Sequence, residues 1–298
     1  MSYRNIEVRK VTPRLGAEIH GVDLSQELEE DTLAEIRRAL VDNQVIFFRD
    51  QDMTLDQHKA FGRRFGELHV HPAAKSPEGH PEVLPIHADE HSRYVAGEAW
   101  HTDVSCDEEP PMASILRLHT VPECGGDTLF SSMYAAYDAL SPRMKEFLKS
   151  CKAVHSGEHV YRGYYQTGKG QRADTQDAYP EHEHPVIRTH PESGRQSLYV
   201  NSGFTTRIVG LNKDESDALL KFLFNHIAQP QFHCRFNWRK NSIAFWDNRC
   251  VQHYAMWDYY PEVRSGYRVT IKGDRPYFDS EGVEGELNLA PHRRVRAA

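Results

Sequence analysis

The sequence predicts an α+β protein with a mainly β core, built as a double-stranded β-helix (jelly roll) with flanking helices. Short apolar and aromatic runs recur along the chain, and amphipathic helical segments lie between them. Strands that are short and far apart in sequence must pair over long range, which favours a jelly-roll barrel. No internal repeat or low-complexity segment is present. The strand-like runs are 113–118, 197–200, 243–246 and 269–271.

The first predicted helix begins near Thr32. Glu35 stands three residues after this threonine, which is the capping-box pattern, and apolar residues recur at helical spacing up to Asn43. The short run 44–48 that follows is mostly apolar and uncharged. It predicts a buried strand.

A second helix is predicted to begin at Thr54, which forms another capping-box pattern with Gln57. We expect it to end at Gly66, because glycine commonly follows the last helical turn. Apolar residues at helical spacing make 132–150 and 214–228 two further helical candidates.

Length and composition predict one domain that spans residues 1–298. A chain of 298 residues that is 39% hydrophobic can bury one large core, and no Pro/Gly/Ser-rich linker divides it. The stretch 156–185 is polar and aromatic and rich in Tyr, Gly, Gln and Asp. It predicts a long loop, and the favoured interpretation is a lid or insert that orders over a bound substrate.

Charge and cysteine content exclude several classes of function. The formal net charge of -7 gives no electrostatic basis for binding nucleic acid. The five cysteines are scattered and odd in number, as expected of reduced thiols and not of a disulfide framework. No apolar run approaches the length that spans a bilayer. We therefore expect a cytoplasmic protein with no nucleic-acid and no membrane partner.

His101 and Asp103 stand two residues apart and are both metal-ligand types. Residues i and i+2 of an extended segment face the same side, so one imidazole and one carboxylate can reach one point. His253, just past an apolar run and a turn, can add a third ligand from a distant strand. Two nitrogens and one oxygen with open positions are typical of non-haem Fe(II) that activates oxygen. Because the chain has 18 histidines, the His101–Asp103 spacing alone is weak evidence for a metal site, and the prediction depends on neighbouring residues.

Two arginines follow His253 at short spacings. Arg264 comes eleven residues later, and Arg268 four beyond that. A guanidinium binds a carboxylate through two parallel hydrogen bonds. A structural salt bridge explains either arginine equally well when it is taken singly. Two of them near a candidate ligand favour an anion site beside the metal.

With these residues the chain resembles the taurine dioxygenase family of Fe(II)- and 2-oxoglutarate-dependent dioxygenases, which includes alkylsulfate and phenoxyalkanoate dioxygenases. The resemblance runs almost from end to end. The segments that carry it are 15–19, 21–24, 61–67, 100–103, 125–128, 200–208, 246–249 and 273–276.

The resemblance implies a ligand set and a cosubstrate site. His101, Asp103 and His253 match the iron ligands of the family. Thr128 and Arg264 match the residues that hold the far carboxylate of 2-oxoglutarate. The implied cofactors are Fe(II), 2-oxoglutarate as cosubstrate and O2, and the implied products are succinate, CO2 and a hydroxylated substrate.

The resemblance also implies a substrate pocket for a small organic anion. The residues that match it are His71, Val104 through its backbone, Phe204 and Arg268. Where the taurine enzyme has a tyrosine and an asparagine, this chain has Ala74 and Gly97. Without those polar groups the ammonium of taurine would lack partners, and an unpaired buried charge is costly. A sulfonate, sulfate ester or aryloxyalkanoate with a larger or less polar body therefore fits better.

Two other classes of function stay open at this point. Zinc held by the same three ligands would activate water for hydrolysis. A non-catalytic barrel that binds a small anion is the other alternative. Thr128 and Arg264 argue against a hydrolase, which needs no site for a dicarboxylate. Relatives form dimers and tetramers, so we expect a homo-oligomer.

Overall fold

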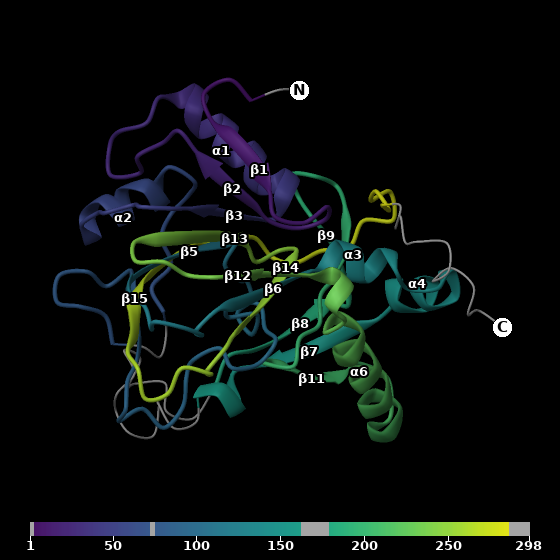
Figure 1. Cartoon of the computed structure of the whole chain (residues 1–298). Coiled ribbons are helices and arrows are strands. Elements are labelled where there is room, and N and C mark those ends of the chain that lie inside the picture. The colour runs from purple at the N-terminus through teal and green to yellow at the C-terminus, as the bar shows by residue number, and fades with distance from the viewer. Residues whose placement is uncertain (1–2, 72–74, 162–178, 286–298) are drawn as a thin grey trace.

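The computed structural model describes residues 3–71, 75–161 and 179–285 (Figure 1). Within these ranges, no helix has the length and apolar character needed to cross a membrane. The strands are β1 (Glu7–Lys10), β2 (Ala17–His20), β3 (Val45–Phe48), β4 (Val83–Ala88), β5 (Ala113–Thr120), β6 (Thr128–Ser132), β7 (Lys152–Ser156), β8 (Glu181–Pro185), β9 (Ile187–Thr189), β10 (Gln196–Leu198), β11 (Thr205–Ile208), β12 (His233–Phe236), β13 (Ser242–Asp247), β14 (Val251–Ala255) and β15 (Arg264–Ile271). The helices are α1 (Glu30–Asn43), α2 (Leu55–Arg63), α3 (Met133–Asp138), α4 (Pro142–Lys149), α6 (Lys213–Ile227) and the 3-10 helix η1 (Pro230–Phe232).

A seven-stranded sheet forms the main body, in the order β1-β2-β3-β13-β5-β15-β4. All its neighbours pair antiparallel except β2 and β3. Strands β12, β6 and β14 form a second sheet, and β11, β7 and β8 a third. The partners of each strand are mostly distant in sequence, as the short scattered runs predict. The chain therefore has a sheet-rich α+β fold.

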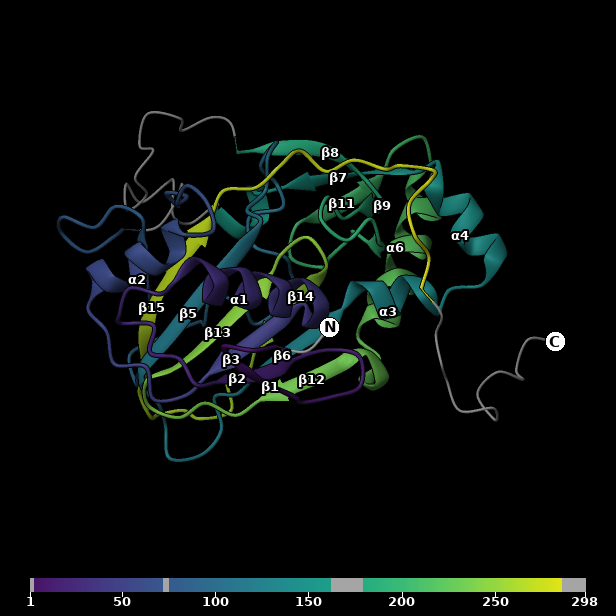
Figure 2. The same ribbon diagram turned by 90° about the horizontal axis from the view of Figure 1, so that it is seen from above.

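The two faces of the seven-stranded sheet contact different cores. Successive side chains of a strand alternate between faces, so Ile46 and Phe48 of β3 pack toward α1 and α2. Val45 and Phe47 point the other way, toward the β12-β6-β14 sheet. There Phe47 stacks on Phe236 with ring centroids 4.0 Å apart. Figure 2 shows α1 crossing β3 and β13 on the outer face. The inner face, between the two sheets, therefore contributes to an apolar layer, and it also carries polar side chains that line the cavity described below.

The remaining helices gather with the third sheet at one end of the molecule. Figure 1 shows α3, α4 and α6 beside β7, β8 and β11. Their apolar residues form a core of their own, which includes Tyr137, Leu198, Leu220 and Leu223. Phe204, which lines the cavity described below, comes directly before β11 at this end.

One predicted helix start is confirmed and one is wrong. The Thr54 side chain accepts a hydrogen bond from the Gln57 backbone and Gln57 reciprocates, so the capping box of α2 is present. Helix α1 instead begins at Glu30, before Thr32, and its N-cap makes no side-chain hydrogen bond. The Glu35 carboxylate accepts hydrogen bonds from the backbone of residues 4–6. The Glu35 side chain, which the local pattern assigned to the capping box, therefore makes long-range hydrogen bonds instead.

Other boundaries differ from the predictions as well. The single helix predicted over 132–150 is two helices, because Ser141 caps a new start at Pro142. The run predicted over 197–200 is a strand only over Gln196–Leu198. The loop predicted over 156–185 begins at the end of β7 and closes with strand β8, while residues 162–178 lie outside the described residues.

His58 on α2 is expected to make the stability of the fold depend on pH. Its ring is buried against the carbonyl of Ile115, and burial lowers its pKa from 6.5 to about 4. As the pH falls below 6.5, this histidine becomes protonated in the unfolded chain but stays neutral in the folded chain. The free energy of unfolding therefore decreases between pH 6.5 and about pH 4. At pH 5 this loss is about 2 kcal/mol. Urea unfolding at pH 7 and pH 5 measures it. In His58→Gln the decrease in unfolding free energy from pH 7 to pH 5 should be smaller by that amount. An equal decrease in the variant and the unmodified protein would contradict the prediction.

Candidate functional site

One cavity of about 530 Å³ collects every described residue that the sequence marked as functional. It opens between the inner face of the seven-stranded sheet and the β12-β6-β14 sheet. Ala74 lies outside the described residues. The predicted residues that line the cavity are His71, His101, Asp103, Val104, Thr128, Phe204, His253, Arg264 and Arg268.

Strand geometry explains why residues so far apart in sequence meet here. Strand β15 begins at Arg264, earlier than predicted, so Arg264 and Arg268 are four apart in one strand and face the same side. On β14, His253 pairs with Phe130 of β6, and Thr128 is the first residue of that strand. His101 forms an isolated bridge with His253, and each backbone N–H donates to the carbonyl of the other.

His101, Asp103 and His253 form a group in which each residue offers a ligand atom within 4.8 Å of the others. Asp103 Oδ1 lies 3.7 Å from His101 Nε2 and 4.0 Å from His253 Nε2. His101 Nδ1 lies 2.8 Å from the carbonyl of Ala99, which can only accept. His101 Nδ1 therefore holds the proton, and the lone pair of Nε2 points into the group. Asp103 lies in a turn and not in the extended segment predicted, yet its carboxylate reaches the same point.

Burial and the neighbouring polar groups set the charges of this group. Burial lowers the pKa of both His101 and His253, so both rings are neutral near pH 7. Burial alone would raise the pKa of Asp103, but the Arg268 guanidinium, the two imidazoles and the Ser114 hydroxyl together hold the pKa well below its usual range. Arg268 Nη1 lies 2.5 Å from Asp103 Oδ1. The group thus presents two neutral nitrogens and one anionic oxygen, the donor set that suits Fe(II).

Arg264 is a buried cation beside a hydroxyl. Its Nε donates to the carbonyl of Gly126 at 2.9 Å and its Nη2 to Thr128 Oγ1 at 3.2 Å. Burial lowers the pKa of Arg264 to about 10, so it stays charged at neutral pH. Among the described residues no carboxylate lies within ion-pair distance of it. Trp238 Nε1 also donates to Thr128 Oγ1, at 3.0 Å, so the threonine proton is free to donate. A carboxylate that enters the cavity would find a cation and a hydroxyl donor together.

Val104 has an uncommon backbone conformation next to Asp103. Its φ is +47°, which is strained for a β-branched residue and marks positions where the surroundings hold the chain in place. Its side chain is buried against Phe204 and Tyr161. Within the described part of the chain the Val104 amide donates no hydrogen bond, so it is available to an anion.

Most of the remaining wall is apolar and was not found from the sequence. Strand β4 supplies Leu84 and Ile86, and β5 supplies Leu116. Apolar strand residues have no pattern that separates a cavity wall from an ordinary core. Gly97 contributes by lacking a side chain, because an added Cβ would lie 3.1 Å from His101 Cε1. Lys75 and Glu98 are the additional charged residues of the wall.

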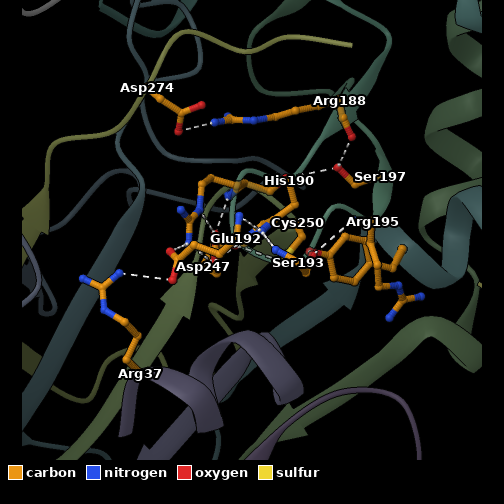
Figure 3. Close-up of polar contacts among 12 residues, drawn as sticks. Arg37, Arg188, His190, Glu192, Ser193, Arg195, Ser197, Asp247, Cys250 and Asp274 are labelled. Carbon is orange, nitrogen blue, oxygen red and sulfur yellow. Dashed lines mark hydrogen bonds and ion pairs between the residues drawn. The ribbon is translucent and has the colours of Figure 1, made fainter. Parts of the chain in front are cut away.

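A second group of candidate ligands, formed by His190, Asp247 and Cys250, is fully buried behind the β13-β14 turn (Figure 3). His190 Nε2 lies 2.9 Å from Asp247 Oδ2. His190 Nδ1 accepts two backbone N–H groups, from residues 192 and 193, so its proton is on Nε2 and donates to Asp247. Arg249 binds both oxygens of the same carboxylate. Because the lone pair of His190 and the carboxylate oxygens of Asp247 already accept hydrogen bonds, the group is an ion-pair network and not a metal site.

Replacing Asp247 is expected to destabilise the fold. Burial alone would raise the pKa of Asp247, but Arg249 and His190 together hold the pKa far below its usual range. In Asp247→Asn, Arg249 keeps Glu192 as its remaining partner while its buried pair is broken. We expect a loss of about 3 kcal/mol in the free energy of unfolding, measured with urea.

A Zn²⁺ titration tests whether the His190 group binds metal. Added Zn²⁺ should leave the stability of a His101→Ala variant unchanged, since a gain would indicate metal binding at His190.

The comparisons with known proteins agree with this geometry. Residues 7–270 match the family described as "Taurine catabolism dioxygenase TauD, TfdA family". An alpha-ketoglutarate-dependent sulfate ester dioxygenase of Pseudomonas putida is 36% identical over 290 residues, or 95% of this chain and 93% of the relative. An alpha-ketoglutarate-dependent sulfonate dioxygenase of Saccharomyces cerevisiae is 34% identical over 295 residues, or 94% of this chain and 70% of the relative. The crystal structure of a taurine dioxygenase from Burkholderia xenovorans aligns with a TM-score of 0.80 at 37% identity, over 95% of this chain and 96% of that one.

The chain belongs to the TauD, TfdA family of dioxygenases. It is an alpha-ketoglutarate-dependent dioxygenase and therefore an oxidoreductase that uses Fe(II), 2-oxoglutarate and O2. This excludes the zinc hydrolase and the non-catalytic barrel as its class.

Proposed function

We propose that this enzyme hydroxylates a small organic anion with an apolar body, such as a sulfonate, sulfate ester or aryloxyalkanoate. The observation that supports this best is that one cavity contains a possible metal-ligand group, a buried arginine that has no carboxylate partner in the described part of the chain, and a second arginine paired with Asp103. Each substrate molecule would consume one O2 and one 2-oxoglutarate and release succinate and CO2. Hydroxylation of the carbon that bears sulfur or oxygen would then lead to C–S or C–O cleavage.

In this proposal His101, Asp103 and His253 hold Fe(II), which suits their two neutral nitrogens and one carboxylate oxygen. When bound, the iron would supply the chemistry that couples the oxidative decarboxylation of 2-oxoglutarate by O2 to hydroxylation of the substrate. The side chains of Arg264 and Thr128 bind the far carboxylate and so orient the cosubstrate. The apolar walls exclude water from the reacting atoms.

The anionic end of the substrate is assigned to Arg268, His71 and the amide of Val104. Arg268 is buried and shares the cavity with both others. Phe204 and Tyr161 provide an apolar surface for the body of the substrate, and Tyr161 also contacts the His71 ring edge to face. Tight binding would thus need both a negative end and an apolar remainder.

We also infer that the seven-stranded sheet and the β12-β6-β14 sheet together form the predicted double-stranded β-helix, in one domain over 1–298. Support comes from their shared apolar layer, in which Phe130 of β6 packs near Phe47 and Trp246 of the large sheet. The cavity lies at the end of this layer.

The test is a substrate series assayed for succinate release and substrate loss in equal amounts. The series compares hexyl sulfate, hexanesulfonate, phenoxyacetate and taurine, and taurine is included because Glu98 could accept its ammonium. Each buried methylene is worth about 0.8 kcal/mol, so we expect the best apolar anion to exceed taurine in kcat/KM by at least about 10-fold. Taurine as the best substrate would refute the proposed class. Anaerobic addition of Fe(II) and 2-oxoglutarate should also give a visible charge-transfer band.

A further inference from the structure

A chain of three buried hydrogen bonds ends on the carboxylate of Asp103. Trp246 Nε1 lies 2.9 Å from Asn248 Oδ1, and Asn248 Nδ2 lies 3.0 Å from Ser114 Oγ. Ser114 Oγ lies 2.6 Å from Asp103 Oδ2. Ser114 and Asn248 are fully buried, and Trp246 and Asp103 nearly so. None of the first three residues was predicted from the sequence to act on the metal group.

The chemistry of the groups gives this chain one direction. An indole N–H can only donate, so the oxygen of the Asn248 amide must face Trp246 and its nitrogen must face Ser114. Because Asn248 donates to the Ser114 hydroxyl, the proton of that hydroxyl is free to go to Asp103. The ionised carboxylate of Asp103 can only accept. Every bond in the chain therefore points toward Asp103 Oδ2.

The backbone holds the two middle residues of this chain in place. Ser114 lies on β5 directly opposite Trp246 of β13 and Thr270 of β15, in the middle of the seven-stranded sheet. The Asn248 backbone N–H donates to the carbonyl of Met112 at 2.8 Å. The donor to Asp103 thus comes from a rigid part of the sheet and not from a loop.

We propose that Ser114 and Asn248 are positioning residues that decide which oxygen of Asp103 faces the metal. The Ser114 hydroxyl occupies Oδ2, which leaves Oδ1 to face the two imidazoles at 3.7 and 4.0 Å, while Arg268 Nη1 also binds Oδ1. Asp103 would then offer a single oxygen in a set orientation to a bound Fe(II). The inference rests on the proposed role of Asp103 as a ligand.

The experiment measures the Fe(II) dissociation constant of the whole protein without oxygen, by competition with a coloured chelator. Ser114→Ala should weaken Fe(II) binding by about 10-fold or more, because loss of a group that orients a ligand typically costs that much. Ser114→Thr retains the hydroxyl and should restore most of the affinity. If the effect of Ser114→Ala were only a packing defect, Ser114→Thr, which adds a methyl group to a fully buried site, would not restore the affinity, so the two variants separate these causes.

Ser131→Ala is the matched control. Ser131 is likewise fully buried, and its hydroxyl donates one hydrogen bond of 2.9 Å, to the carbonyl of Ile227 on the other side of β6. We expect it to change Fe(II) affinity less than about 2-fold while it lowers the stability of the metal-free protein about as much as Ser114→Ala does. Equal Fe(II) affinity in the two alanine variants would overturn the inference. Failure of the unmodified protein to bind Fe(II) would instead overturn the proposed function.

Discussion

Asp103→Ala should abolish turnover and weaken Fe(II) binding by on the order of 1,000-fold, because it removes the anionic member of the ligand group. The two imidazoles that remain are neutral, and their nitrogens alone leave a weak site for a divalent ion. Full activity in this variant, or in His101→Ala, would refute the ligand assignment. Both succinate release and anaerobic Fe(II) titration measure the effect.

Two further variants separate the loss of a ligand from a loss of fold. Without Asp103 the buried Arg268 has lost its ion pair, and breaking a buried pair costs about 3–5 kcal/mol. Asp103→Asn retains the shape and a hydrogen-bond acceptor, so it should fold better than the alanine variant and still lose turnover. His226→Gln is the matched control for His101→Ala, because His226 is a buried ring that binds a carbonyl outside the cavity. Its activity should match that of the unmodified protein.

The site was predictable where local spacing determines geometry. Arg264 and Arg268 stand four apart, which places them on one face of any strand that contains both. His101 and Asp103 were predicted for a similar reason, although the segment turns at Asp103. His253, the proposed third ligand, could be located because it follows a recognisable strand and turn. Chemistry that depends on a few residues at short spacing leaves a signature in the sequence.

The supporting residues left no such signature. Ser114 is one serine in a buried strand, and its partner Asn248 is 134 residues away. The apolar wall from β4 looks like any other strand. Glu35 shows the opposite error, since a sound local pattern was overruled by contacts about 30 residues away in sequence. Such roles depend on tertiary contacts, which neither propensity nor spacing encodes. The expected homo-oligomer and cytoplasmic location stay predictions.

Arg264→Leu should raise the KM for 2-oxoglutarate by about 100-fold or more and leave substrate affinity nearly unchanged. The reason is that Arg264 is a buried cation that no described carboxylate neutralises, and the 2-oxoglutarate carboxylate would pair with it away from bulk water. A charged pair of this kind is worth several kcal/mol when one partner is removed. Succinate release at increasing 2-oxoglutarate, with the other substrate saturating, measures the change.

Two milder variants test whether the forked shape of the guanidinium matters. Arg264→Lys keeps the charge but replaces two parallel donors with one compact ammonium, so its KM for 2-oxoglutarate should lie between those of the leucine variant and the unmodified protein. Thr128→Val removes the hydroxyl with little change of shape, and loss of one hydrogen bond to a charged group predicts an increase of about 10-fold. If Arg264→Leu keeps its KM for 2-oxoglutarate but loses affinity for the sulfonate or sulfate substrate, Arg264 binds the substrate anion and the two arginines have been assigned in the wrong order.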